Sequence, residues 1–569
     1  MKKITTIVVL SVLLSALMPL HARDFTYTYE GQTITYTVLD EEAKTCATKA
    51  GIRSGIYHGP YPLYSSAGNK VSGNLVLPTN PIDDDVKYTL VEIGEGSFSV
   101  NELTSVTIPN TVQLINISAF QYCSDLVSIK IPESVQTILL GAFEDCTGLS
   151  KAEFASIEHL CNIFFFGGDS NPLYYAKHLF INGEEIIDLV IPETVTDISD
   201  GAFVGCNNLK SVKFGSSVSY IGGGAFSGCS GLTSITIPNS VTEIGYAAFS
   251  GCDNIQHVEF TSIEHLCRIY FEYVTSNPLY YAKHLFINGE EIIDLVIPDS
   301  ITTIGQYAFS YCNNLRSVVI GNTVSGIGTE AFSHCTNLSS VAISNSVETI
   351  GDYAFSSCSN LTSLIIPNSV TEIGESAFWS CIGLTELTIP NSVTKIGYGA
   401  FSGCTGLTSV IIPNSVTEIG KHAFSDCRGL TTINIPNSVI SIGDRAFYNC
   451  SGLTSVYYNT DSPIEGDIYT FYDDNSSKSA YAMATLYMPA KGLEKAKEIA
   501  PWKHFRRNQE YDFGGVTDVI ADKAGEIDYT HPYEIYNFNG AKVGDNKDTL
   551  APGLYIIRQG TTTKKISVQ

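Results

Sequence analysis

The sequence predicts an all-β-dominated solenoid: a coil of 23-residue repeats whose strands stack into a parallel sheet. Three observations predict this fold. A phenylalanine, usually after alanine, recurs along the chain, and its last six steps are all 23 residues. Around each copy the same apolar pattern returns. The 569 residues are 44% apolar and only 16% charged, a composition that excludes a disordered chain. A fixed period in the twenties marks a solenoid, whose coils bury their apolar faces against one another.

The first 22 residues predict a signal peptide. Lys2 and Lys3 precede an apolar run from Ile4 to Leu17, and Ala22 is a small residue at the expected cleavage point. The run is shorter than the ~20 apolar residues of a membrane span. No later stretch of 18 apolar residues follows. We therefore expect an exported protein with no transmembrane span.

Residues 23–71 predict an N-terminal β cap. They are rich in tyrosine and threonine, and polarity alternates through residues 25–29 and 34–38. Alternation of this kind indicates strands, and the first coil of a solenoid needs a cover for its open end.

The repeats proper extend over residues 72–458. The copy at 384–401 shows the pattern. Its inward positions are apolar: Leu384, Leu387, Ile389, Val393, Ile396 and Phe401. Glu386 and Thr388 alternate with them and are expected to point outward. Pro390 ends the strand, because proline donates no hydrogen bond to a ladder.

Two coils, near residues 149–191 and 255–297, are longer than the rest. Corresponding strand positions follow at 37 residues there, instead of 23. Both coils hold the same insert, and the second copy follows the first at an offset of 106 residues, which equals 37 + 3 × 23. This arithmetic indicates the duplication of a four-coil block.

Beyond Leu453 the period fails. Residues 459–513 predict a C-terminal cap, with a last strand at 484–489 and a short amphipathic helix at 491–503. Residues 514–569 contain three further strand runs, which predict a small C-terminal β-module.

Charge and motifs narrow the functional classes. The net charge of −25 excludes nucleic acid and anionic membranes as partners, because both need a basic surface. The sequence contains no G-x-S-x-G, H-E-x-x-H or P-loop motif. Each insert repeats a set of His, Cys and Glu residues, which duplication explains as well as a metal site does. We expect no catalytic residue, no cofactor and no metal.

The cysteines follow the repeat. Twelve of the 15 lie three residues after a repeat phenylalanine. Disulfides are common in exported proteins, but stacked coils hold these side chains parallel, a poor fit to the disulfide dihedral angle. We expect a mostly reduced, buried row of thiols.

Two sets of residues are candidates for binding a partner. The first is a group of outward hydroxyls on the predicted sheet: Thr362, Ser363, Thr385, Thr388, Thr408 and Ser409. Good β propensity would explain them, and a hydrogen-bonding platform for a large repetitive partner is the functional alternative. The second set is aromatic and lies in the inserts, where we would expect a discrete pocket: Tyr174, Tyr175, Tyr280 and Tyr281.

The repeat itself carries a family resemblance. The unit I-P-N-S-V-T-x-I-G-x-x-A-F-S-G-C, seen at 237–252 and 412–427, resembles the BspA-like (Treponema-type) leucine-rich repeat. The resemblance implies a right-handed leucine-rich-repeat coil. In the tail, residues 540–543, 552–556 and the segment from Lys564 resemble the C-terminal sorting domain of the type IX (Por) secretion system of Bacteroidota. An additional β cap is the alternative for this tail.

These resemblances imply an extracellular protein at the outer-membrane cell surface. The function they favour is a non-enzymatic adhesin for host matrix or plasma proteins such as fibronectin and fibrinogen, or for another bacterial surface component. Two alternatives remain: a glycan- or peptide-binding surface protein that uses the insert aromatics, and a surface-coat or cell-aggregation component. An enzyme is the least favoured class.

Overall fold

The structure is a computed structural model, and the elements below belong to its described residues, 23–53, 64–66, 68–475, 478–511, 534–537, 542–544, 553–559 and 562–568. The expected signal peptide lies outside these residues. The chain divides into two compact units: 1–265 with 269–290, and 266–268 with 291–569. Within the described part, no helix has the length and apolarity needed to span a bilayer.

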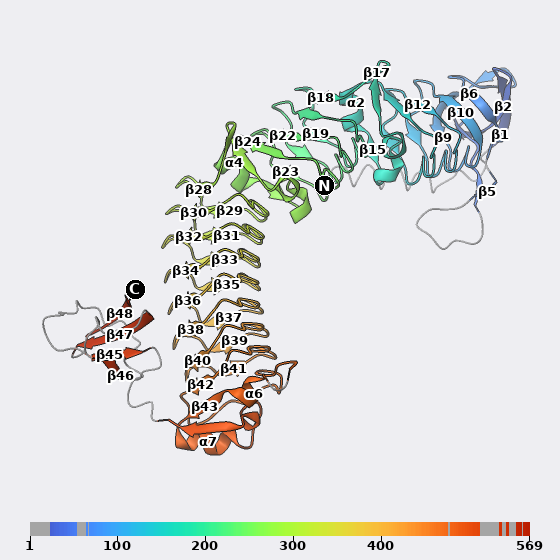
Figure 1. The fold of residues 1–569 in the computed structure, drawn as a ribbon. Coiled ribbons are helices and arrows are strands. Elements are labelled where there is room, and N and C mark those ends of the chain that lie inside the picture. The colour runs from blue at the N-terminus through green and yellow to red at the C-terminus, as the bar shows by residue number, and fades with distance from the viewer. Residues whose placement is uncertain are drawn as a thin grey trace. The chain divides into compact units, whose positions relative to one another are not determined.

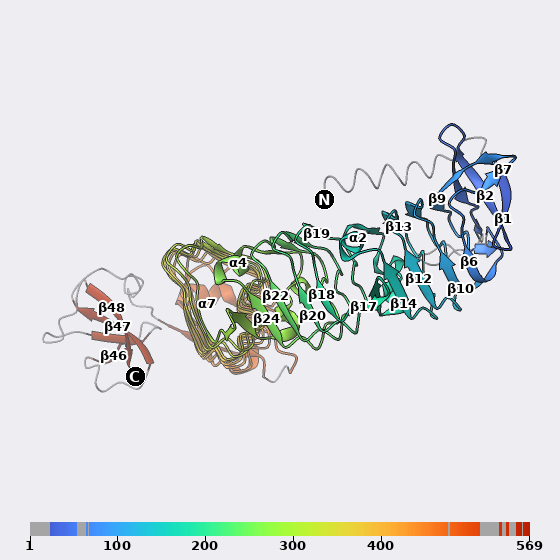
Figure 2. The ribbon, with the colours of Figure 1, turned by 90° about the horizontal axis from the view of Figure 1, so that it is seen from above.

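Each unit is a stack of coils (Figure 1). Every regular coil contributes one longer strand, here called a face strand, and one two-residue strand, here called a back strand. Both kinds pair in parallel with their counterparts in the next coil. The coils of the second unit superimpose when the stack is viewed along its length (Figure 2). The predicted solenoid with parallel sheets is confirmed.

In the first unit the face strands are β6 (Ser72–Val76), β10 (Glu102–Thr107), β12 (Ser128–Ile131), β14 (Lys151–Phe154), β16 (Leu179–Ile181), β18 (Asp188–Val190), β20 (Ser211–Lys213), β22 (Ser234–Ile237), β24 (His257–Phe260) and β26 (Leu285–Ile287). The back strands are β9 (Thr89–Ile93, longer than the others), β11 (Leu114–Ile115), β13 (Thr137–Ile138), β15 (Phe164–Phe165), β19 (Asp197–Ile198), β21 (Tyr220–Ile221), β23 (Glu243–Ile244) and β25 (Tyr270–Phe271).

In the second unit the face strands are β28 (Asp294–Val296), β30 (Ser317–Val319), β32 (Ser340–Ala342), β34 (Ser363–Ile365), β36 (Glu386–Thr388), β38 (Ser409–Ile411), β40 (Thr432–Ile435), β42 (Ser455–Tyr458), β43 (Thr485–Met488) and β44 (Arg507–Glu510). The back strands are β29 (Thr303–Ile304), β31 (Gly326–Ile327), β33 (Thr349–Ile350), β35 (Glu372–Ile373), β37 (Lys395–Ile396), β39 (Glu418–Ile419) and β41 (Ser441–Ile442).

The N-terminal cap is a β-meander on the back-strand sheet. Strands β1 (Asp24–Tyr29), β2 (Gln32–Asp40) and β3 (Thr45–Thr48) pair antiparallel, and β3 then pairs in parallel with β9. Two short hairpins, β4 (Ile52–Arg53) with β5 (Tyr64–Ser66) and β7 (Ile82–Asp83) with β8 (Val86–Lys87), complete this region. The strands expected at 25–29 and 34–38 are confirmed.

The core is a file of stacked phenylalanine rings. In the second unit, successive rings from Phe309 to Phe447 lie 5.2–5.5 Å apart with interplanar angles of 12° or less. Phe471 continues the file at 5.0 Å, beyond the point where the sequence period fails. The predicted inward residues Leu384, Leu387 and Ile389 are buried. Stacking of equivalent residues therefore makes one apolar interior out of coils that have none alone.

All fifteen cysteines are free and buried in the structure. Ten of the twelve repeat thiols donate a hydrogen bond to the carbonyl of the phenylalanine in the preceding coil. Cys404 Sγ lies 3.3 Å from Phe378 O, and Cys427 Sγ lies 3.2 Å from Phe401 O. Burial raises the pKa of the Cys404 thiol to about 12.

This row of thiols predicts alkaline sensitivity. An unfolded cysteine ionises near pH 8.5, whereas burial holds the pKa of Cys404 higher in the folded chain. The stabilisation is complete below the unfolded pKa and is lost as pH rises toward the folded pKa. We expect the thermal midpoint to fall between about pH 9 and pH 12. Thermal melts followed by circular dichroism over this pH range check the prediction. In a chain with Cys381, Cys404 and Cys427 changed to alanine, the thermal midpoint should fall less steeply with pH. Native thiols that react with Ellman's reagent at pH 8 would contradict the prediction.

Each of the two long coils contains an additional face strand, which the sequence analysis did not predict. In the first, β16 pairs in parallel with β14, and Leu179 lies opposite Ala152, 27 residues earlier in the chain. The chain then reverses at Asn182 and Gly183, both with positive φ, into β17 (Glu184–Glu185), which is antiparallel to β16. The Asn-Gly pair favours a β-hairpin with a two-residue loop. The second insert repeats the arrangement with β26 and β27 (Glu290–Glu291).

Short helices replace the usual turn in both inserts. They are α2 (Ile157–Asn162), η1 (Gly168–Ser170) and α3 (Leu173–Ala176) in the first, and α4 (Ile263–Arg268), η2 (Val274–Ser276) and α5 (Leu279–Ala282) in the second. Ser156 caps α2, because its side chain accepts a hydrogen bond from the His159 amide.

The C-terminal cap corrects two expectations. Its helices are α6 (Ala480–Met483), α7 (Ala490–Ala496) and η3 (Trp502–His504), so α7 is shorter than the predicted 491–503. Pro501 cannot continue a helix interior, and buried Trp502 donates its indole N–H to Ile464 O at 2.7 Å. The strand expected to be last, β43, is followed by β44, which pairs with it in parallel.

The tail folds as a small antiparallel sheet. Its strands are β45 (Glu534–Asn537), β46 (Lys542–Gly544), β47 (Gly553–Gln559) and β48 (Thr562–Val568), in the order β46-β45-β47-β48. The first of the three predicted runs contributes two of these strands.

Candidate functional site

The six predicted hydroxyl residues lie on one face of the second unit. β34, β36 and β38 place them in three consecutive coils: Thr362, Ser363, Thr385, Thr388, Thr408 and Ser409. Ser363 pairs with Glu386, and Glu386 pairs with Ser409. We call this surface the hydroxyl face. Its side chains are exposed, except Thr388, which is half-buried.

Two threonine hydroxyls of this face are already hydrogen-bond donors within the sheet. Thr385 Oγ1 donates to Thr362 O at 3.2 Å, and Thr408 Oγ1 donates to Thr385 O at 3.2 Å. Thr431 and Thr454 continue the pattern. Their protons are therefore used internally, while the oxygen lone pairs remain able to accept. The threonine row consequently suits a partner that supplies hydrogen-bond donors.

An apolar column beside the hydroxyls was missed by sequence reasoning. It is formed by the third residues of the face strands in the second unit and is interrupted by Thr388 and Asn434; its most exposed members are Ile365 (79%), Val296 (61%) and Val319 (46%). The signal was available, because runs such as Leu-Ile-Ile at 364–366 put an aliphatic residue at an outward position. Exposed aliphatic side chains in a row favour contact with another macromolecule.

The same column ends in tyrosines. Tyr457 and Tyr487 stack with ring centroids 4.5 Å apart and an interplanar angle of 10°, and Tyr511 meets both rings edge-on. Burial raises the pKa of Tyr457.

The four predicted insert tyrosines form two separate pairs in the first unit. Tyr174 and Tyr175 lie edge to face, 5.0 Å apart, and Tyr280 and Tyr281 do so at 4.9 Å. Tyr174 is exposed, and the others are half-buried. Lys177 Nζ lies 4.8 Å from the centre of the Tyr174 ring. Burial raises the pKa of Tyr175 and of Tyr281 to about 12.

Asn171 anchors the first of these pairs. Its buried side-chain amide donates to Gly201 O at 2.9 Å and to Ala202 O at 3.0 Å, while its oxygen accepts from the Leu173 amide at 3.0 Å. One side chain thus joins the start of α3 to the following coil.

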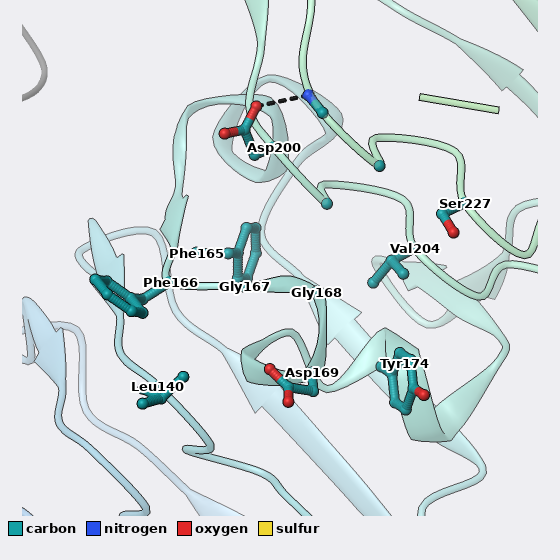
Figure 3. Close-up of a pocket in the computed structure, with 13 residues that line it drawn as sticks. Leu140, Phe165, Phe166, Gly167, Gly168, Asp169, Tyr174, Asp200, Val204 and Ser227 are labelled. Carbon is teal, nitrogen blue, oxygen red and sulfur yellow. Dashed lines mark hydrogen bonds between the residues drawn. The ribbon is translucent and has the colours of Figure 1, made fainter. Parts of the chain in front are cut away.

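A cavity of about 600 Å³ opens beside α3 (Figure 3). Its lining comes from β15, η1, α3 and the turns of the following coils: Leu140, Phe165, Phe166, Gly167, Gly168, Asp169, Tyr174, Asp200, Gly201, Val204, Gly223, Gly224 and Ser227. Tyr174 is the one predicted site residue that lines it. Sequence reasoning missed Asp169, Asp200 and the glycines, although Gly-Gly-Asp at 167–169 differs from the second insert and could have drawn attention.

Two carboxylates line this cavity in different environments. Asp200 Oδ1 accepts hydrogen bonds from the Gly223 amide at 2.6 Å and from the Tyr220 hydroxyl at 3.3 Å. Asp169 is half-buried, and burial raises the pKa of its carboxyl.

A second cavity, of about 650 Å³, lies along the edge of the face strands in the second unit. Its lining is largely polar: Ile293, Asn314, Arg316, Asn337, Ser339 and Asn360. Arg316 lies 3.6 Å from Asp294, a separation that leaves an exposed and weak ion pair.

Histidines and acidic residues of the inserts form hydrogen bonds with nearby groups. His159 Nε2 lies 2.8 Å from Val135 O, and His178 Nδ1 lies 2.5 Å from Glu185 Oε1. Among the residues that the structure describes, no three His, Cys, Asp or Glu side chains are grouped to hold a metal ion.

A stack of coils with a long exposed face is a repeat solenoid, the class of scaffold that binds partners over an extended surface. Residues 85–170, 175–281, 280–408 and 399–487 match the BspA type leucine rich repeat region. The chain belongs to this family of leucine-rich-repeat surface proteins.

Three solved structures are similar to the chain. A leucine rich cell surface protein from Faecalibacterium prausnitzii A2-165 is 25% identical, with 68% of this chain and 94% of that one covered and a TM-score of 0.40. A leucine-rich repeat protein from Bacteroides ovatus is 22% identical, with 84% and 98% covered and a TM-score of 0.41. The pneumococcal vaccine antigen PcpA is 17% identical, with 86% and 99% covered and a TM-score of 0.38. No curated protein matches the chain.

Proposed function

We propose that this protein is a non-enzymatic adhesin of the bacterial cell surface, and that the hydroxyl face and its apolar column bind a host matrix or plasma protein of the fibronectin or fibrinogen type. One observation carries the proposal. Along the face strands of the second unit, a row of threonine oxygens runs beside a column that holds exposed Val296, Val319 and Ile365 and, further along, half-buried Ile411, Tyr457 and Tyr487.

A large partner suits this geometry better than a small one. Each coil adds only a few weak contacts, and a partner that spans several coils multiplies them through avidity. The side-chain amides, ammonium groups and backbone N–H groups of a protein would supply the donors that the threonine row lacks. Another bacterial surface component with the same chemistry is the alternative partner.

Export and display complete the proposal. Residues 1–22 would direct the chain out of the cytoplasm, and the tail from residue 514 would act as a type IX sorting domain. The antiparallel sheet of β45 to β48 supports a separate module at this end. Membership of a family of surface proteins supports the location.

The test flows the chain from residue 23 to 569 over immobilised fibronectin, fibrinogen and mucin glycans. Saturable binding to a matrix or plasma protein is expected. Ile365→Arg should weaken it by about tenfold or more, because it places a charge in the centre of the apolar column. Thr394→Arg, at an exposed position beside back strand β37, is the matched control and should leave binding unchanged. Equal loss in both variants would contradict a role for the face.

A second function is favoured by exposed Tyr174 at the first cavity. Under this alternative the protein captures a glycan or peptide at the insert. Tyr174→Ala would then abolish glycan or peptide capture and leave binding to immobilised matrix protein intact.

A further inference from the structure

The two inserts share a framework but differ where the first one lines its cavity. Residues 171–192 are identical to residues 277–298, and residues 156–161 are identical to 262–267. Between these blocks, the first insert has Phe-Gly-Gly-Asp at 166–169, and the second has Glu-Tyr-Val-Thr at 272–275. All four residues of the first insert line the cavity. The divergence is therefore concentrated on the cavity, while the supporting helix and hairpin are unchanged.

The following coils differ in the same way. At the offset of 106 residues, Asp200, Gly201 and Gly223 correspond to Gln306, Tyr307 and Thr329. Small residues and carboxylates of the first copy are thus replaced by larger or uncharged residues in the second. The residues that line the first cavity are therefore specific to the first copy and are not part of the repeat pattern.

The polar groups on this lining accept rather than donate. The Gly223 amide already donates to Asp200, the Gly201 amide to Gly223 O at 2.8 Å, and the Gly224 amide to Tyr246 O at 2.8 Å. In the described part of the chain, neither Asp169 nor Asp200 forms an ion pair with a lysine, arginine or histidine. No lysine, arginine or histidine is among the lining residues, and the nearby Lys177 Nζ lies over the Tyr174 ring, 4.8 Å from its centre.

Two aromatic side chains also line the cavity, on either side of Asp169 (Figure 3). Phe166 is 45% exposed and Tyr174 is 42% exposed, and both belong to the lining (Figure 3). A cation attached to an apolar stem can place its charge near a carboxylate and its stem against a ring. The volume of about 600 Å³ has room for two or three residues of an extended peptide.

We propose that this cavity binds a basic peptide segment, with a lysine or arginine side chain directed to Asp169 and the rest of the segment held along Phe166, Tyr174 and Asp200. The site is separate from the hydroxyl face and goes beyond the adhesin function. We expect no such site at the second insert, because Tyr273 and Val274 stand where the first insert has Gly167 and Gly168.

The test is calorimetric titration of the chain from residue 23 to 569 with blocked Gly-Lys-Gly and Gly-Arg-Gly peptides, against blocked Gly-Gly-Gly and N-acetylglucosamine. Binding of both basic peptides, weakened by salt, is expected. Gly168→Val introduces the residue of the second copy and should weaken binding at least tenfold. A Cβ at Gly168 meets only Val204 Cγ2 at 3.5 Å, so the fold should be kept. Asp169→Asn should weaken binding about tenfold through loss of a charged hydrogen bond.

Val274→Ala, at the equivalent place in the second insert, is the matched control and should bind as the unchanged chain does. The proposal is overturned if no basic peptide binds at millimolar concentration, if N-acetylglucosamine binds instead, or if Asp169→Asn binds equally well. The test of the hydroxyl face uses other residues and another ligand, so either proposal can fail without the other.

Discussion

Phe378→Ala is expected to lower the free energy of unfolding of the second unit by about 3–5 kcal/mol. Phe378 is fully buried, with the rings of Phe355 and Phe401 at 5.5 and 5.4 Å. Its removal deletes a large apolar side chain and leaves a cavity between two rings that the surrounding backbone holds in place. Because each coil contacts only its neighbours, the loss is local, and the urea transition should broaden as the stack divides there.

The matched control for this variant is Trp379→Ala. Trp379 is the next residue and is as large, but its side chain is exposed. Urea unfolding followed by circular dichroism should show little change for it. Equal destabilisation by the two substitutions would contradict the view that the phenylalanine file holds the stack together.

Asn171→Ala is expected to cost about 2–4 kcal/mol and to disturb the first cavity. The substitution leaves Ala202 O and the Leu173 amide without the partners that Asn171 provides, whereas Gly201 O keeps a bond from the Val204 amide at 3.2 Å. Both orphaned groups are buried with Asn171, and a buried polar group without a partner is costly. The start of α3 should loosen, and Tyr174 would move with it.

Thermal melts and peptide titration together check this prediction. Asn162→Ala is the control, because Asn162 is exposed and makes one bond, to Glu158 O at 2.9 Å. It should leave both stability and peptide binding unchanged. An Asn171→Ala chain as stable as the parent would show that α3 is held by its apolar contacts alone.

The repeat made much of this fold predictable. Periodicity encodes burial directly, so the inward positions of Leu387 and Phe401 and the outward position of Glu386 follow from spacing. The turns that break the period were harder. Asn182-Gly183 is a strong sequence signal for a hairpin. The sequence does not show, however, that β16, the strand before this turn, pairs with β14.

The candidate sites were predictable only in part. Threonines on the face could be named, but the direction of their hydrogen bonds depends on the neighbouring coil. The first cavity is open because Gly168, Gly201 and Gly223 have no side chains to fill it. These glycines lie up to 55 residues apart in sequence. No local sequence pattern predicts this cavity, because it forms only when the coils are stacked.

The hydrogen bonds between coils have a consequence for how such proteins change length in evolution. The thiol of Cys404 and the hydroxyl of Thr408 both donate to carbonyls one coil earlier, Phe378 O and Thr385 O. Coils that keep these residues thus present the same acceptors to the coil that follows and the same donors to the coil before. A gene can therefore gain or lose a whole 23-residue unit, and the hydrogen bonds at the new junction will still form. An insertion of any other length must satisfy its hydrogen bonds in another way, as the hairpin of β16 and β17 does.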